Sequence, residues 1–173
     1  MRQDFIHTVQ HKVAISAIPP STFRGSKAGL VAAAREFLRT LDLSGFAVSD
    51  SKRFATSLDR MTVKFWKTLP RGSGSWGVAR KALNLFLRDA FYNTYLRKRF
   101  KLLRAESCLE IPLDGVVAHR LRRLLPRKLP AWPGVKLLTK EVSDAYQMAA
   151  MHEAHKMNLS RVHLDIYLWT NRE

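Results

Sequence analysis

Residues 69–84 read LPRGSGSWGVARKALN, and this stretch decides how the rest of the chain is expected to fold. Its first half holds one proline and two glycines within six residues, and such a segment cannot continue a helical hydrogen-bond ladder. A helix is expected to begin near Trp76 or Gly77 and to end within the basic run 97–101, because apolar residues recur at helical spacing. Residues 69–75 therefore form a turn between two predicted helices. The residues of the second helix that are expected to face inward are Val78, Leu83, Phe86, Leu87 and Phe91.

Two helices are predicted before this turn. One covers residues 27–41, where leucines, alanines and a phenylalanine recur at three- and four-residue spacing, and Ser26 is its expected N-cap. The other runs from about Ser51 to Lys67 and ends at the turn. Together with the helix after the turn, they provide the apolar faces of a helical core.

The sequence pattern after residue 101 predicts a segment without regular structure and then three helical segments. Asp114 is expected to cap a short helix that contains Val117. Prolines at positions 126, 130 and 133 indicate an extended connection. Helical periodicity returns over residues 139–156 and again over residues 159–169.

The N-terminal region gives a weaker pattern. Residues 13–18 are the one run that could alternate as a strand, and Ile18-Pro19-Pro20 indicates an extended arm over residues 1–25. No internal repeat of fixed period is present. The sequence therefore predicts an all-α fold, a single compact helical domain over residues 1–173.

Composition indicates a soluble domain with an acidic partner. The chain has 173 residues and 46% hydrophobic content, which suits one domain with a core. Thirty Lys and Arg against fourteen Asp and Glu give a net charge of +16, an excess beyond what solubility requires. Nucleic acid is the first candidate partner, and an anionic membrane surface is the other. Uncharged stretches such as residues 28–34 are too short to span a bilayer.

Cysteine and histidine usage predicts neither a metal nor another cofactor. Cys108 is alone, which excludes an intramolecular disulfide and a four-cysteine iron–sulfur or zinc site. His152 and His155 are three residues apart, one short of the zinc-protease spacing. The N-terminus lacks the apolar stretch of a secretory signal. We therefore expect a cytoplasmic protein associated with the nucleoid.

Lys81 and Asp114 are the clearest candidates for catalytic residues. A neutral lysine amine is a nucleophile, and a position in the first helical turn, next to Arg80 and partly desolvated, would lower its pKa in the required direction. Asp114 at a helix N-cap is favoured as a carboxylate. It would accept a proton from Lys81, orient it, or stabilise a developing oxocarbenium ion. The alternative is a solvated surface lysine and an ordinary cap.

Both settings resemble the helix-hairpin-helix DNA glycosylase superfamily. Residues 77–84 are similar to its hairpin signature of glycine, hydrophobic residue, glycine, any residue, lysine and a later asparagine, with Ala79 at the second glycine. Leu113-Asp114 is similar to the aspartate helix, although Gly115-Val116 stands where threonine-histidine is common. The long interval between Lys81 and Asp114 resembles the archaeal 8-oxoguanine DNA glycosylase branch, which has no iron–sulfur cluster. The resemblance covers about residues 69–124.

This resemblance implies a set of site residues. Lys81 and Asp114 would be catalytic, and the backbone N–H groups of Gly77, Val78 and Ala79 would bind a DNA phosphate. Asp165 and Trp169, four apart on one helical face, would line the base pocket. Further stacking candidates are Trp66 and Trp76, and candidates for backbone contacts are Arg97, Lys98, Arg99, Lys101, Arg104, Arg120, Arg122, Arg123, Arg127 and Lys128.

The implied function is a monomeric DNA glycosylase with AP lyase activity on double-stranded DNA. The enzyme would flip a modified base out of the duplex and excise it, with Lys81 attacking the anomeric carbon of the sugar. The resemblance favours 8-oxoguanine, while other bases, including bulky ones from viral DNA, stay open, so both repair and antiviral defence are possible roles. Two alternatives remain: a noncatalytic helix-hairpin-helix DNA-binding module and an RNA-binding protein.

Overall fold

The computed structural model describes residues 3–23, 28–125 and 128–170. These residues form eight α-helices joined by loops and four short 3₁₀ helices, and they contain no strand, which confirms the all-α prediction. The α-helices are α1 (Gln3–Ala17), α2 (Leu30–Arg39), α3 (Ser51–Thr68), α4 (Trp76–Tyr92), α5 (Thr94–Arg99), α6 (Gly115–Leu124), α7 (Lys140–Lys156) and α8 (Arg161–Thr170). The 3₁₀ helices are η1 (Pro20–Phe23), η2 (Leu43–Phe46), η3 (Leu102–Ala105) and η4 (Val135–Leu137).

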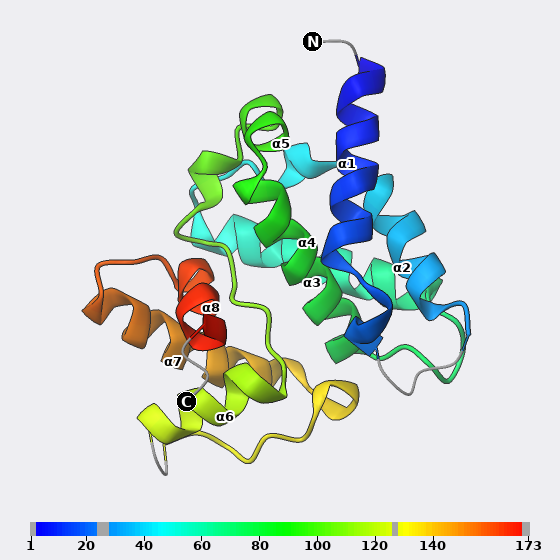
Figure 1. The fold of residues 1–173 in the computed structure, drawn as a ribbon. Coiled ribbons are helices and arrows are strands. Elements are labelled where there is room, and N and C mark those ends of the chain that lie inside the picture. Colours follow the sequence, from blue (N-terminus) through cyan, green and yellow to red (C-terminus); the bar gives the residue numbers. More distant parts are fainter. Residues whose placement is uncertain (1–2, 24–27, 126–127, 171–173) are drawn as a thin grey trace.

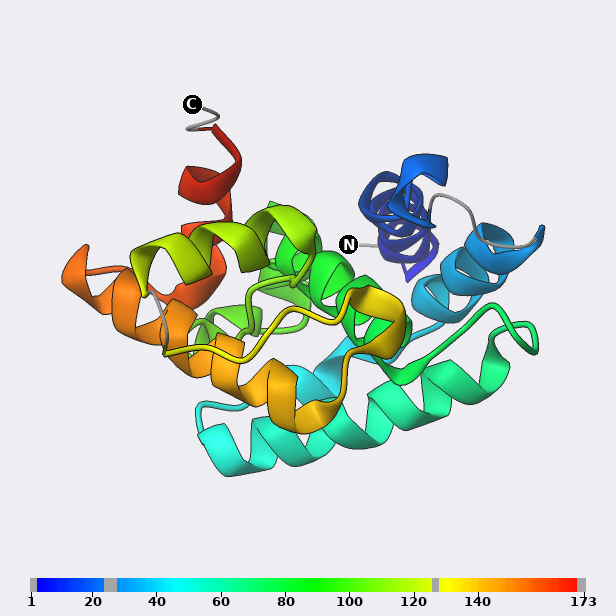
Figure 2. The ribbon, with the colours of Figure 1, turned by 90° about the horizontal axis from the view of Figure 1, so that it is seen from below.

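Helix α4 lies at the centre of the fold (Figure 1). It contacts α1, α2, α3, α5 and η4, and most of its side chains are buried, including Leu83 and Phe86. One apolar cluster is built from helices α1 to α5, and a second joins α6, α7 and α8. Figure 2 shows α1 and α2 on one side of α4, with α6, α7 and α8 on the other. The central helix therefore presents its remaining face between two groups of helices.

Side-chain caps mark where five of the described α-helices begin, and the cap of α5 is Asn93. Asp50, Ser75, Asp114 and Thr139 each accept a hydrogen bond from a backbone N–H of the following first turn. Such caps satisfy donors that the helix itself leaves unpaired. The predicted cap at Asp114 and the predicted helices over residues 51–67 and 139–156 are confirmed.

The N-terminal prediction was wrong. Residues 3–17 form α1, neither a strand over residues 13–18 nor an extended arm, and Ile6, Ala14 and Ile18 are buried in the first apolar cluster. Pro19 and Pro20 mark the end of this helix, because proline cannot continue the hydrogen-bond ladder.

Two other predicted helices differ at their ends. Helix α2 begins at Leu30 after Gly29, whose φ of 88° suits glycine. The sequence analysis expected this helix to begin at Lys27 with Ser26 as its cap, and both residues lie outside the described residues. The helix after the turn ends at Tyr92, because Asn93 leaves helical geometry and its side chain caps a separate helix, α5. No helix among the described residues has the length and apolar content needed to cross a bilayer.

Gly77 allows α4 to pack closely against η4. A Cβ atom at this position would lie 2.2 Å from the carbonyl oxygen of Val135 and 2.7 Å from Cβ of Leu138. The contact is with backbone, which cannot move aside as a flexible side chain would. The glycine therefore sets the separation between the two segments.

We expect Gly77→Ala to lower the free energy of unfolding by about 1–3 kcal/mol, as overpacking a tight contact does. Gly45→Ala is the matched control, because a Cβ at Gly45 meets nothing within 4 Å. Urea denaturation of both variants measures the difference. Equal stability of the two variants would show that α4 and η4 separate without cost.

Candidate active site

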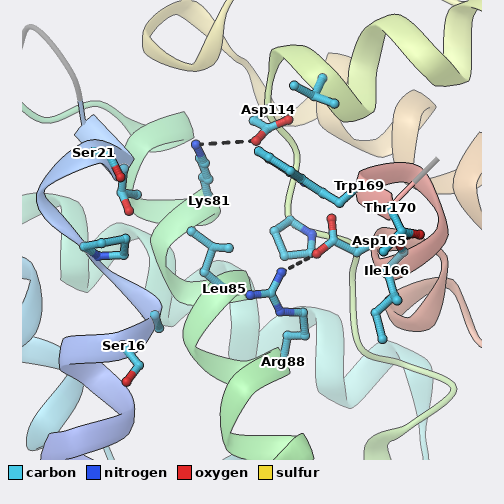
Figure 3. A pocket seen from close by; sticks show the side chains of 15 residues that line it. Ser16, Ser21, Lys81, Leu85, Arg88, Asp114, Asp165, Ile166, Trp169 and Thr170 are labelled. Carbon is cyan, nitrogen blue, oxygen red and sulfur yellow. Dashed lines mark hydrogen bonds and ion pairs between the residues drawn. The ribbon is translucent and has the colours of Figure 1, made fainter. Parts of the chain in front are cut away.

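A cleft of about 970 Å³ runs along the exposed face of α4. Four regions line it: the end of α1 with η1, the middle of α4, the start of α6 with Pro112, and the end of α8. Figure 3 shows α4 between the N-terminal segment on one side and α8 on the other. The lining residues are Ser16, Ala17, Pro19, Ser21, Thr22, Lys81, Leu85, Arg88, Pro112, Asp114, Val116, Asp165, Ile166, Trp169 and Thr170.

Lys81 and Asp114 meet in this cleft although they are distant in the sequence. The Nζ atom of Lys81 lies 3.8 Å from Oδ2 of Asp114, and their side chains are 13% and 18% exposed. Asp114 is held by its role as the α6 cap, where its Oδ1 accepts a hydrogen bond of 3.0 Å from the backbone N–H of Val117. An amine and a carboxylate therefore face each other with access to solvent.

Burial lowers the pKa of Lys81, while the negative charges of Asp114 and Asp165 oppose that shift. The direction agrees with the sequence-based prediction, but the local cause differs. Helix α4 begins at Trp76, so Lys81 lies in its second turn and not in its first. Arg80 points away into a buried network with Glu110, Asp59 and Thr62. Partial desolvation of the amine is thus the main effect.

The predicted pocket residue Asp165 lies in the same cleft and pairs with Arg88. Asp165 is buried, and Arg88 donates from Nη1 to its Oδ2. Arg88 also pairs with Asp89 through Nε and Nη2 at 2.8 Å. Burial raises the pKa of Asp165, and the Arg88 guanidinium opposes that shift. The Arg88 guanidinium, held between two carboxylates, therefore lines the cleft.

Arg88 was missed by the sequence-based prediction. The signal for it is helical spacing, because Lys81, Leu85 and Arg88 are four and three residues apart and so lie on one face of α4. The residues that α1 and η1 contribute, such as Ser16 and Ser21, were also missed, because those residues were assigned to an extended arm outside the core.

The tryptophans have different environments. Trp169 lines the cleft, is 37% exposed, and in the view of Figure 3 lies between the carboxylates of Asp114 and Asp165. Trp66 is exposed on α3 and donates to the carbonyl of Gly74. Trp76 packs against the second apolar cluster, with the Arg80 guanidinium over its ring. Only Trp169 of these three lines the cleft.

Gly77, Val78 and Ala79 do not lie in the cleft. They belong to the first turn of α4 and are buried. The N–H of Val78 donates to Oγ of Ser75, and the N–H of Ala79 donates to the carbonyl of Ser75. The predicted helix start near Trp76 or Gly77 is confirmed. The N–H groups of Val78 and Ala79 are already paired with Ser75, and phosphate binding by this segment stays a prediction.

Helix α8 is fixed to the rest of the domain near its start. The His163 ring bonds at both of its nitrogens: Nδ1 lies 2.8 Å from the Tyr92 hydroxyl oxygen, and Nε2 lies 2.9 Å from Oε1 of Glu106. Arg161 donates to the backbone carbonyls of Cys108 and Leu109. These contacts hold the helix that carries Asp165 and Trp169 into the cleft.

The remaining candidates lie on the surface. His152 and His155 are exposed on α7, while the buried Glu153 pairs with Lys156. Within the described ranges, no three His, Cys, Asp or Glu side chains are arranged to hold a metal ion. The described residues of the basic runs are exposed or half-buried, and Arg127 lies outside them.

Comparison with known proteins found no match among protein-family models, curated proteins or solved structures. The functional assignment therefore rests on the cleft and its side chains.

Proposed function

We propose that this protein is a DNA glycosylase with associated AP lyase activity, and that Lys81 is its nucleophile. The observation that carries the proposal is the meeting of Lys81 and Asp114 in one solvent-accessible cleft, with the pKa of the lysine lowered by burial. A desolvated amine is the residue type that attacks carbon and forms Schiff bases. The net charge of +16 suits a polyanionic substrate.

The chemistry follows from these two groups. The lone pair of neutral Lys81 attacks C1′ of the sugar, and the N-glycosidic bond breaks with its electron pair leaving on the base, which then takes up a proton. Asp114 stabilises the positive charge that develops on the sugar and accepts the proton that the attacking amine loses. The C1′–O4′ bond then breaks, O4′ takes up a proton, and a Schiff base forms between C1′ and Lys81. Loss of a C2′ proton then expels the 3′ phosphate and cleaves the strand.

The rest of the cleft suits an extrahelical base. A base within a duplex must leave the stack before its glycosidic bond is accessible. Trp169 offers an aromatic surface, and Asp165 and Arg88 offer polar groups for the base edge. We propose double-stranded DNA as the partner, and we assign the helix-hairpin-helix role to α3, residues 69–75 and α4.

The direct test is incubation with duplexes that each carry one modified base. The panel includes oxidised, deaminated, alkylated and bulky bases, and release of the free base is measured by mass spectrometry. The proposal predicts release of at least one base and cleavage of the strand. Salt-sensitive duplex binding with no release, identical for the wild type and the Lys81 and Asp114 variants, would instead indicate a noncatalytic DNA-binding module.

The pH dependence of covalent trapping tests the electrostatics of Lys81. Only the neutral amine reacts, so trapping by borohydride should rise with pH up to the pKa of Lys81 and then level off. The Asp114 charge raises that pKa, and Asp114→Asn should therefore move the midpoint to lower pH while keeping the helix cap. Asp144→Asn, on the exposed side of α7, is the control. A midpoint that stays in place or rises in Asp114→Asn would contradict the assignment.

A further inference from the structure

We propose that Arg88 and Asp165 together read the base edge, and that the substrates are modified bases with a lactam edge, a ring N–H beside a carbonyl. This inference rests on the proposed function and specifies its substrate class. Uracil, hypoxanthine and 8-oxoguanine carry such an edge. Cytosine derivatives present a ring nitrogen beside an amine instead, and 1,N6-ethenoadenine has no N–H on that edge.

The geometry of Arg88 is that of a fixed donor. Asp89 holds its Nε and Nη2, and Asp165 holds its Nη1. A guanidinium carries more N–H groups than these contacts use, and the Arg88 side chain is 21% exposed and lines the cleft. Two carboxylates therefore orient its plane, while N–H groups remain for a ligand.

The neighbouring acceptor is Asp165. Only its Oδ2 contacts Arg88, and a carboxylate has two oxygens that accept hydrogen bonds. The ion pair thus offers a cationic donor and an anionic acceptor side by side. A lactam matches this pair best, because its carbonyl oxygen carries more negative charge than a ring nitrogen and its N–H is more acidic than an exocyclic amine.

Position along α4 places this pair where a base would reach it. Arg88 lies seven residues after Lys81, about 10 Å along the helix axis and on the same face. Leu85 lies between them, and Figure 3 shows the Arg88–Asp165 pair further along the cleft than the Lys81–Asp114 pair. A nucleotide with C1′ at Lys81 therefore extends its base along α4 toward Arg88.

Comparison of two activities tests this role. Cleavage at a preformed abasic site involves no base, whereas excision requires base recognition. We expect Arg88→Met to lower excision of uracil, hypoxanthine or 8-oxoguanine by at least about 10-fold relative to abasic-site cleavage by the same variant. Asp89→Asn leaves the Arg88–Asp165 contact in place, so its excision activity should fall less than that of Arg88→Met.

The outcomes separate this inference from the proposed function. Equal loss of both activities in Arg88→Met, with folding confirmed by circular dichroism, would assign Arg88 to the catalytic step or to scaffolding and overturn the inference. Wild-type protein that cleaves abasic sites but excises ethenoadenine or 5-hydroxymethylcytosine as well as lactam bases would also overturn it. Absence of abasic-site cleavage in the wild type would overturn the proposed lyase itself.

Discussion

Lys81→Gln is expected to abolish strand cleavage at an abasic site, with a loss of about 10³-fold or more, as removal of a covalent nucleophile causes. Glutamine keeps much of the side-chain length but has no basic amine. The Asp114 cap and the apolar contacts of α4 are left in place, so duplex binding should be largely intact. The measurement is strand cleavage of a labelled duplex under single-turnover conditions.

Two controls define what the loss means. Lys81→Arg keeps the positive charge, yet a guanidinium stays protonated and is no nucleophile, so this variant should be as inactive as Lys81→Gln. Lys12→Gln removes one charge from an exposed position on α1 and should retain activity. Substantial cleavage by Lys81→Arg would mean that only the charge of Lys81 is needed.

Arg80→Met is expected to give the largest loss of stability, about 3–5 kcal/mol, because it leaves a buried carboxylate without its partner. Arg80 donates to both oxygens of Glu110 at 2.8 and 2.9 Å and to Asp59 at 2.8 Å. Burial alone would lower the pKa of Arg80, but the paired carboxylates raise it. Burial would likewise raise the pKa of Glu110, yet Arg80 holds it below its ordinary value.

Denaturant unfolding measures this loss, with Arg71→Met as the matched control. Arg71 is exposed in the turn, and its replacement should change stability by less than about 0.5 kcal/mol. Replacing both Arg80 and Glu110 with apolar residues should recover much of the stability lost in Arg80→Met. A loss below about 1 kcal/mol in Arg80→Met would show that the buried network contributes little.

The sequence was sufficient for features that depend on local patterns. Helical periodicity and capping chemistry predicted α3 and α7, and the Asp114 cap marked the start of α6. The break after Tyr92 was missed, because Asn93 interrupts an apolar pattern that otherwise continues. Helix α1 was missed because Pro19-Pro20 suggested extended chain, although these prolines follow the helix.

The features of the site that the sequence did not predict are those that depend on tertiary contacts. Gly77 was interpreted as a phosphate-binding residue, but Val135 and Leu138 pack directly on it. The role proposed for Arg88 depends on its contact with Asp165, which lies on a helix far along the chain. Lys81, Asp114, Asp165 and Trp169, by contrast, were predicted together and line one cleft.

Reductive trapping followed by peptide mapping tests the central proposal most directly. The wild-type protein is incubated with an abasic duplex and sodium borohydride, which reduces a Schiff base to a stable secondary amine. The expected result is a covalent protein–DNA adduct located on the peptide that contains Lys81. An adduct on another lysine, or no adduct at all, would contradict the assignment of Lys81 as the nucleophile.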